Sequence, residues 1–272
     1  MTWVIDLGDA AALDPAVAGG KGAGLARLAR ASLPTLPGIV VTTAAFRTAA
    51  GRAPGRLPDL TAAIRAHLAR MGPGPFAVRS SAPAEDGREA SWAGVLDTRL
   101  GVPASGVLRA IGAVWRSARG ARARAYAGRR AIDLAVVVQP LAAAAAAGIC
   151  LTASPAGART PLVVIEAVAG LGAPLAGGTL TPDRYLVDRA TGIVLDARPC
   201  VQPWRLAPGR RGLVRVRLDR AEGAAPKLPL PVVRRIARLA LRAERRLGGP
   251  QDVEWVWDGQ DVALVQARPL IG

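Results

Sequence analysis

Hydrophobic residues follow two periods along this chain, and the two periods alternate in no regular order. Apolar positions three or four residues apart predict helices at residues 21–31, 60–71, 107–130 and 231–247. Short apolar runs between turn residues predict strands at residues 3–6, 38–43, 75–80, 135–139, 148–152, 162–167, 183–188, 192–196, 253–257 and 262–266. Stretches rich in Gly, Pro and Arg predict loops at residues 50–58 and 207–212. Because helices and strands mix without a regular βαβ alternation, the pattern indicates an α+β fold with two lobes.

The longest apolar stretch, residues 135–153, is close to the ~20 residues that a membrane-spanning helix needs. Gln139 and Pro140 interrupt it, and the six alanines at residues 142–147 partition only weakly into lipid. Two short strands around a loop fit this stretch better. The first residues carry no charged segment followed by an apolar run, so we expect a cytoplasmic protein without membrane contact.

The chain is strongly basic, with 36 Lys and Arg against 20 Asp and Glu in 272 residues, a net charge of +16. Only Lys21 and Lys227 are lysines, and the arginines spread over the whole length among Ala, Gly and Pro. Arginines cluster at residues 116–130 and 234–246 with helical spacing, which is typical of a solvated helix face. With only 4% aromatic residues for base stacking, a nucleic-acid partner is not expected.

Candidate nucleophiles and metal ligands are scarce. The only cysteines are Cys150 and Cys200, and the only histidine is His67, in the middle of a predicted amphipathic helix. This composition argues against tetrahedral zinc sites and against Ser-His-Asp or Cys-His catalysis. We assign His67 to an ordinary helix surface.

A glycine-rich segment with one lysine opens the first predicted helix. Lys21 lies among Gly19, Gly20 and Gly22, and the free N–H groups and dipole of a helix N-terminus favour a phosphate. The segment is not a P-loop, because Gly22 rather than Ser or Thr follows the lysine. A plain glycine turn before a helix explains the segment equally well.

Arg79 follows a predicted strand and precedes a polar, acidic loop. A guanidinium at a strand end can bind phosphate oxygens with two parallel hydrogen bonds. The alternative is a surface ion pair with Glu85 or Asp86.

The last predicted hairpin carries two oxygen-bearing side chains, Glu254 and Gln266, which suit a hard cation such as Mg²⁺. If the loop has three residues, 259–261, the numbers of any two paired residues add up to 520, and Glu254 therefore lies opposite Gln266. A two- or four-residue loop turns them to opposite faces. The alternative is an edge hairpin with a polar outer face.

Taken in order, these segments resemble the nucleotide-binding domain of the pyruvate phosphate dikinase, phosphoenolpyruvate synthase and rifampin phosphotransferase family. The resemblance covers nearly the whole chain. It rests on GGKGAGLARL at residues 19–28 with PGIVVTTAAF at 37–46, VRSSAPAEDGREASWAGVLDT at 78–98, VVVQPL at 136–141, IEAVAGLGAPLAGGTLTPDRYLVD at 165–188 and QDVEWVWDGQDVALVQARPL at 251–270.

The resemblance implies an ATP-grasp-like fold that clamps ATP between an N-terminal lobe, residues 1–133, and a C-terminal lobe, residues 134–272. Mg²⁺ is expected to bridge the phosphates. The resemblance implies that Lys21 and Arg79 bind phosphates and take part in catalysis, and that Arg268 stabilises the transferring group. It implies that Glu254 and Gln266 are the Mg²⁺ ligands. The implied nucleotide contacts are Gly94 and Thr98, with an adenine pocket at Gln139, Pro140 and Leu141.

In full-length members of this family the phosphate passes to a His on a separate swivelling domain and then to an acceptor on a third domain. His67 matches no phosphohistidine motif, and we expect neither domain within these residues. The prediction is an ATP-dependent phosphotransferase subunit that passes a phosphoryl or pyrophosphoryl group to a His on a partner chain. The alternatives are a stand-alone enzyme acting on a small molecule and a nucleotide-binding regulatory module without turnover.

Overall fold

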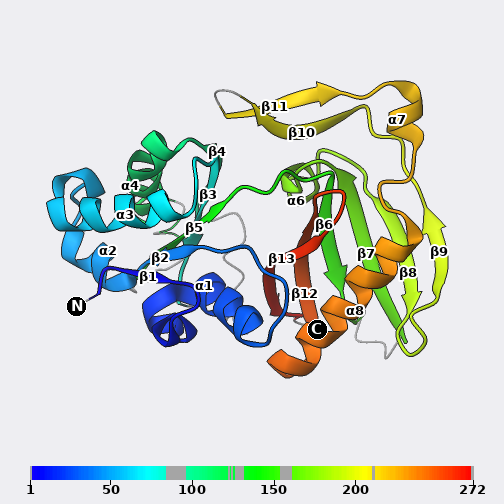
Figure 1. The fold of residues 1–272 in the computed structure, drawn as a ribbon, viewed down its shortest axis with the longest axis horizontal. Coiled ribbons are helices and arrows are strands. Elements are labelled where there is room, and N and C mark those ends of the chain that lie inside the picture. The colour runs from blue at the N-terminus through cyan, green and yellow to red at the C-terminus, as the bar shows by residue number, and fades with distance from the viewer. Residues whose placement is uncertain are drawn as a thin grey trace. The chain divides into compact units, whose positions relative to one another are not determined.

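The computed structural model describes residues 2–83, 96–121, 123, 125, 132–153, 161–209 and 212–270, and the chain divides into two compact units (Figure 1). The first unit comprises residues 1–30 and 36–141, and the second comprises residues 31–35 and 142–272. The chain enters the second unit at Ala31, returns to the first at Leu36 and enters the second again after Leu141, whereas the sequence proposal placed one boundary after residue 133.

The first unit is built on a five-stranded antiparallel sheet with helices on both faces. The strand order is β1 (Val4–Asp6), β2 (Ile39–Val41), β5 (Ala135–Pro140), β3 (Phe76–Ser81) and β4 (Thr98–Val102). Both faces of β5 are buried, which explains its continuous apolar sequence. Helix α1 (Pro15–Arg30) packs on one face with Val40 and Val137. On the other face lie α2 (Thr43–Ala49), α3 (Pro58–Arg70) and α4 (Val107–Ser117).

A kink at Gly19 fixes α1 against the end of β3. Gly19 has φ 70° and ψ 172°, and a Cβ there would lie 2.0 Å from the carbonyl oxygen of Ser81. The Ser81 hydroxyl donates to the Ala18 carbonyl at 2.8 Å and accepts from the Gly22 N–H at 3.0 Å. Helix α1 thus consists of two helical stretches that meet at Gly19. The second stretch agrees with the helix predicted from Lys21, and the helical turns from Pro15 to the kink were not predicted.

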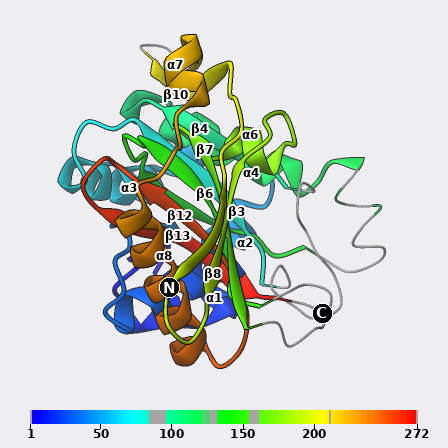
Figure 2. The same cartoon turned by 90° about the vertical axis from the view of Figure 1, so that its right-hand side faces the viewer.

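The second unit contains a six-stranded antiparallel sheet that α8 (Leu230–Leu247) crosses along one face (Figures 1 and 2). Its strand order is β13 (Val262–Pro269), β12 (Gln251–Trp257), β6 (Ala146–Leu151), β7 (Leu162–Ala169), β8 (Asp183–Asp188) and β9 (Val194–Arg198). Every second residue of the central strands is fully buried, as Val253, Cys150 and Ile165 are. These buried residues share the face of the sheet on which the apolar stripe of α8 packs. The strand residues between them point to the opposite face.

A separate two-stranded ribbon corrects one prediction. Residues 207–209 and 212, predicted as part of a loop, belong to the paired strands β10 (Trp204–Gly209) and β11 (Gly212–Arg217), and α7 (Arg220–Ala224) follows them. Val214 and Val216 alternate with Arg215 and Arg217 as in a strand, but Pro208 and Gly209 at the end of β10 give a loop signal. The guanidinium of Arg215 stacks 4.4 Å from the centre of the Trp204 ring.

Four short elements were also absent from the sequence prediction: β4, α2, α6 (Ala173–Ala176) and α7. The predicted strands at residues 135–139 and 148–152 are confirmed as β5 and β6. Within the described ranges, no helix has the length and apolarity to cross a membrane.

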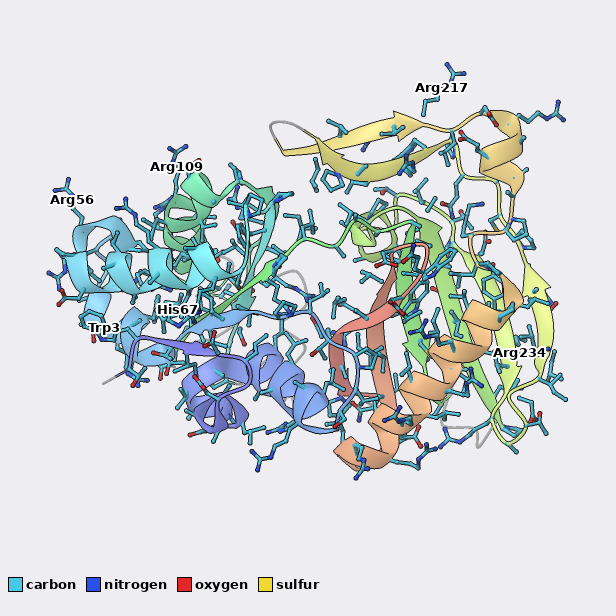
Figure 3. The ribbon with its side chains drawn as sticks, in the orientation of Figure 1. Trp3, Arg56, His67, Arg109, Arg217 and Arg234 are labelled. Atoms are coloured by element: carbon cyan, nitrogen blue, oxygen red, sulfur yellow. The ribbon has the colours of Figure 1, made fainter. Side chains whose placement is uncertain are left out.

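The four arginines labelled in Figure 3, Arg56, Arg109, Arg217 and Arg234, are exposed and extend away from the ribbon. The predicted solvated face of the last helix is confirmed at Arg234. His67 is half-buried on α3, and its Nδ1 lies 2.8 Å from the Ala63 carbonyl oxygen within the same helix.

One buried ion pair ties the start of β8 to the segment before α8. The side chains of Lys227 and Asp183 are 4% and 0% exposed, with 3.6 Å between Nζ and Oδ1. The ammonium also donates to the carbonyl oxygens of Cys200, Gly223 and Ala225. The Tyr185 hydroxyl donates to Asp183, and burial, followed by the nearby Asp183 charge, raises the pKa of that hydroxyl. All the donors of this ammonium are satisfied, so its role is structural.

We expect Gly19→Ala to destabilise the protein more than Gly72→Ala, a matched change at φ 88° in the same unit with nothing within 4 Å of the added Cβ. Both changes carry a left-handed backbone cost of about 1–2 kcal/mol. Overlap with Ser81 adds about 1–3 kcal/mol at Gly19 only. Urea unfolding measures both free energies, and equal losses would contradict the close contact with β3.

We also expect Lys227→Met to lower the free energy of unfolding by about 3–5 kcal/mol, because it leaves the Asp183 carboxylate buried without its counter-charge. Arg198→Ala, which breaks the exposed ion pair with Asp196, is the control and should cost less than about 1 kcal/mol. Similar losses for the two variants would show that the buried pair has no special role in stability.

Candidate functional site

In the first unit, three of the predicted site residues lie on one face of the sheet. Arg79 of β3 pairs directly with Thr98 of β4, and the neighbouring Ala77 pairs with Gln139 of β5. Directly paired residues of antiparallel strands point to the same side, and residues two apart on a strand do so as well. Arg79, Thr98 and Gln139 therefore share the face that α1 covers.

Lys21 belongs to α1 and lies where this helix meets the end of β3. The N–H groups on either side of it are held, that of Gly20 by the Ala82 carbonyl at 2.9 Å and that of Gly22 by the Ser81 hydroxyl. Ser81 follows Arg79 by two residues on the same strand face. The backbone thus brings the half-buried Lys21 and Arg79 to the same end of β3.

The segment predicted to line an adenine pocket ends β5. Gln139 is 2% exposed, and its Nε2 donates to the carbonyl oxygen of Leu36 at 2.9 Å. Leu141 donates its N–H to the Pro75 carbonyl oxygen at 2.8 Å. The amide side chain of Gln139 thus joins β5 to the chain before β2, and Pro140 and Leu141 are half-buried.

Gly94 and the alternative ion-pair partners of Arg79, Glu85 and Asp86, lie outside the described residues.

In the second unit, Glu254 and Gln266 are direct cross-strand partners, as predicted. The reason differs from the predicted one. Trp257 pairs with Val262, so the loop has four residues, which alone would set Glu254 opposite Val265. A register shift between Glu254 and Trp255, a β-bulge on β13, adds one residue and restores the pairing with Gln266.

Next to this pair, Arg268 is held by an acidic residue. Its Nε and Nη2 donate to Asp252 Oδ2 at 3.0 and 2.7 Å. Asp252 precedes Glu254 by two residues and pairs directly with Arg268, so all four side chains lie on the face turned away from α8. Asp252 Oδ1 is buried without a hydrogen-bond partner. The carboxylate therefore fixes the orientation of the guanidinium.

The oxygen atoms of Glu254 and Gln266 suit a hard cation whose remaining ligands come from phosphates and water. Among the described residues, no group of three or more His, Cys, Asp or Glu side chains can hold a metal ion. A carboxylate and an amide facing each other on adjacent strands fit a cation delivered with a nucleotide better than a structural metal of four protein ligands.

Cys150 offers no competing nucleophile. Cys150 is fully buried on β6, and burial, followed by the charge of Asp252, raises the pKa of its thiol. A thiol in this environment stays protonated and unreactive.

Sequence reasoning missed two residues that position the candidate site. Asp252 shares the period-two alternation of Glu254, and this spacing could have identified it as a neighbour of Arg268. The second is Ser81, whose hydroxyl joins α1 to β3. That role depends on a contact between residues 59 positions apart, for which the sequence carries no local signal.

Comparisons with known proteins agree with this architecture. The family described as the pyruvate phosphate dikinase AMP/ATP-binding domain matches residues 54–271. The chain is 34% identical to rifampicin phosphotransferase of Streptomyces sviceus, an alignment that covers 98% of the chain and 36% of that protein. For the prodigiosin synthesizing transferase of Serratia marcescens the identity is 33%, with 99% and 33% covered.

The phosphoenolpyruvate synthase of Aeropyrum pernix is 28% identical over 92% of the chain and 40% of that protein. The chain thus spans between a third and two fifths of the length of these relatives. The predicted α+β, ATP-grasp-like fold is confirmed, and the family match supports the binding of ATP. It belongs to the family of pyruvate phosphate dikinase AMP/ATP-binding domains.

Proposed function

We propose that the chain binds ATP with Mg²⁺ and passes a phosphoryl or pyrophosphoryl group to a His on a separate partner chain. The observation that carries the proposal is the pairing of Glu254 with Gln266, with Arg268 two residues further along the same face. A carboxylate, an amide oxygen and a guanidinium on one sheet face are the groups that phosphoryl transfer requires around a nucleotide phosphate.

The first unit contributes the other cations. Lys21 and Arg79 lie near the same end of β3, and we assign them to the phosphates of ATP. Arg79 can bind two oxygens of one phosphate, whereas Lys21 acts as a compact point charge. We assign Thr98, Gly94 and the segment Gln139 to Leu141 to contacts with the rest of the nucleotide.

Glu254 and Gln266 are the residues that would hold Mg²⁺. When bound, the ion neutralises negative charge on the phosphate oxygens. The guanidinium of Arg268, fixed by Asp252, stabilises charge on the transferring group, so the ion pair between these two residues serves to orient a catalytic side chain.

The acceptor lies outside these residues in this proposal. His67, the only histidine of the sequence, is half-buried with Nδ1 at 2.8 Å from the Ala63 carbonyl. His67 matches no phosphohistidine motif, so we propose a carrier histidine on another chain.

We expect Lys21→Ala and Glu254→Gln each to weaken the binding of Mg-ATP by about tenfold or more, since each removes a charged contact worth roughly 1.5–3 kcal/mol. Calorimetric titration of the purified chain with ATP and Mg²⁺ measures the change. The matched controls are Arg217→Ala and Asp196→Asn, which remove the same kinds of charge from exposed positions and should leave the affinity unchanged.

Equal affinity in the wild type and in both site variants would remove the site assignment. Loss of binding in the control variants as well would attribute the effect to net charge rather than to these side chains.

Product analysis tests the acceptor. With ATP labelled at its β-phosphate, we expect label to move to a phosphohistidine domain expressed separately, with AMP as the released nucleotide. Arg268→Lys keeps the charge but not the paired hydrogen bonds to Asp252, and should slow this transfer more than it weakens ATP binding. ADP formation with a small molecule, in the absence of that domain, would instead identify a stand-alone kinase. Binding without any product under either condition would identify a regulatory module.

A further inference from the structure

The β10–β11 ribbon lies at one end of the second unit, beside the six-stranded sheet rather than within it (Figures 1 and 2). No described residue of the ribbon is buried. Strand β10 is fixed to the rest of the unit, because the Leu171 N–H donates to the Leu206 carbonyl oxygen at 2.9 Å. In the described ranges, no strand lies along the outer edge of β11. The ribbon is therefore a two-stranded sheet with one edge held and one edge open.

The hydrogen-bond pattern of the ribbon determines which residues present their backbone at the open edge. The Leu218 N–H donates to the Pro203 carbonyl oxygen at 3.0 Å, so these residues form a hydrogen-bonded pair. Hydrogen-bonded and non-hydrogen-bonded pairs alternate in an antiparallel ladder. The pairs that contain Arg217 and Arg215 are therefore of the second kind, and their N–H and C=O groups point outward from β11. The outward carbonyl of Leu206 on β10 follows the same alternation.

The same two residues carry exposed cations. Arg215 and Arg217 are exposed, and in the part of the chain that the structure describes neither forms an ion pair with a carboxylate. Because they are two residues apart on one strand, their side chains share a face and lie about 7 Å apart along the strand. The sequence has no Asp or Glu between residues 196 and 219. The open edge of β11 is thus positively charged.

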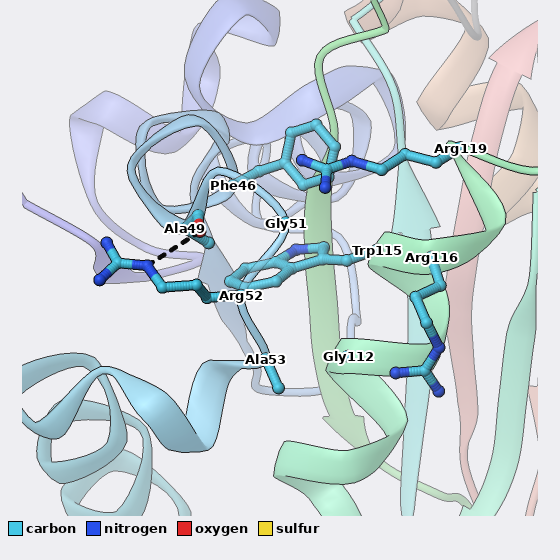
Figure 4. A pocket seen from close by; sticks show the side chains of 9 residues that line it. All are labelled: Phe46, Ala49, Gly51, Arg52, Ala53, Gly112, Trp115, Arg116 and Arg119. Atoms are coloured by element: carbon cyan, nitrogen blue, oxygen red, sulfur yellow. Dashed lines mark hydrogen bonds between the residues drawn. The ribbon is translucent and has the colours of Figure 1, made fainter.

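A tryptophan orients one of these guanidinium groups. The Arg215 guanidinium lies 4.4 Å from the centre of the Trp204 ring, and Trp204 pairs directly with Arg217 on the same face. In the first unit, Arg119 lies over the Phe46 ring at 5.5 Å (Figure 4). Phe46 is buried in the core of that unit, whereas Trp204 is only half-buried. Tryptophan and arginine are enriched among the residues that dominate protein–protein binding.

The composition of this edge determines the kind of chain that can pair with it. Exposed edge strands are templates for pairing with another strand. A second copy of β11 would set arginine opposite arginine, and like charges directly opposite each other destabilise a strand pair. Val201 and Val214, near the arginines, are 70% and 44% exposed. Such aliphatic side chains gain from burial against a polypeptide, but not against the phosphate backbone of a nucleic acid. The edge therefore suits an acidic segment of a partner protein.

We propose that an extended acidic segment of a partner protein adds to β11 as a third, antiparallel strand. The residues opposite Arg217 and Arg215 form backbone hydrogen bonds with them and carry carboxylates on the face of the two guanidinium groups. Leu213 is the next outward residue of β11, so the position opposite it is apolar. The segment has the pattern acidic, any residue, acidic, any residue, apolar. No residue of β11 is assigned to ATP, so the inference does not rest on the proposed transfer reaction.

The test uses two fluorescein-labelled peptides of equal composition and charge. In TTETETVTT the glutamates are two residues apart and point to one face of a strand, whereas in TTEETTVTT they are adjacent and point to opposite faces. Fluorescence anisotropy during titration with the full chain measures both affinities. We expect the first peptide to bind saturably and about threefold more tightly or better, because the second loses one opposite-charge cross-strand pair.

Amide hydrogen exchange of the ¹⁵N-labelled full chain locates the contact. At saturation, the first peptide should slow the exchange of the Arg215 and Arg217 N–H groups several-fold. The N–H groups of Val214 and Val216 belong to hydrogen-bonded pairs with β10 and should keep their exchange rates. A contact through side-chain charge alone would leave all four rates unchanged.

The double variant Arg215→Gln with Arg217→Gln should weaken the binding of the first peptide by about tenfold, because both charge-assisted contacts are lost. The matched control is Arg234→Gln with Arg238→Gln, exposed arginines of α8 whose loss changes the net charge equally. The control should keep the wild-type affinity for the peptide, and both double variants should keep the wild-type midpoint of urea unfolding.

Four results would overturn the inference. They are equal affinity for the two peptides or no binding of either, unchanged exchange at Arg215 and Arg217, equal weakening in the two double variants, and tighter binding of a nine-nucleotide oligothymidylate or of phosphatidylserine vesicles than of the first peptide. Absence of ATP binding by the wild type would instead remove the proposed function and leave this inference standing.

Discussion

A single extra residue in β13 determines which side chains the candidate metal pair contains. Without the bulge, the four-residue loop would pair Glu254 with Val265. Gln266 would then point to the face that α8 covers. The bulge brings Gln266 and Arg268 to the face of Glu254 and Asp252. Near the loop, Val262 and Leu264 stay in register with Trp257 and Trp255 and are buried. One strand thus contributes to the core at one end and to the candidate site at the other.

This bulge is also a feature of the candidate site that could not be predicted from the sequence. The pairing of Glu254 with Gln266 was predicted, but from a three-residue loop that the structure does not contain. Nothing in the residues around Val265 indicates a bulge. Strands buried on both faces, such as β5, were predictable from their apolar runs, whereas α2 begins at Thr43, directly after a buried strand, and depends on the capping hydroxyl of Thr42. No described residue of the β10–β11 ribbon is buried, and Pro208 and Gly209 mask the short alternation of Val214 and Val216 with arginines.

For anion binding, the way a neighbouring group orients an arginine matters more than the number of arginines in the chain. A net charge of +16 indicates an anionic partner only in general terms, and most arginines point into solvent. Arg268 is instead oriented by Asp252, and Arg119 is held over Phe46 with the Gly51 backbone beside it. In each case a neighbouring group fixes a guanidinium that would otherwise sample many conformations. Such preorganisation lowers the entropy lost when an anion binds.

Two buried nitrogen donors show two ways in which the protein holds a polar group in its core. The Lys227 ammonium has three carbonyl oxygens and a carboxylate around it, and its surroundings leave no donor for an external molecule. The indole N–H of Trp115 has no acceptor among the described residues, and the indole N–H groups of Trp255 and Trp257 are buried in the same way. Apolar packing of the rings, rather than a hydrogen bond of the nitrogen, therefore holds these tryptophans in the core.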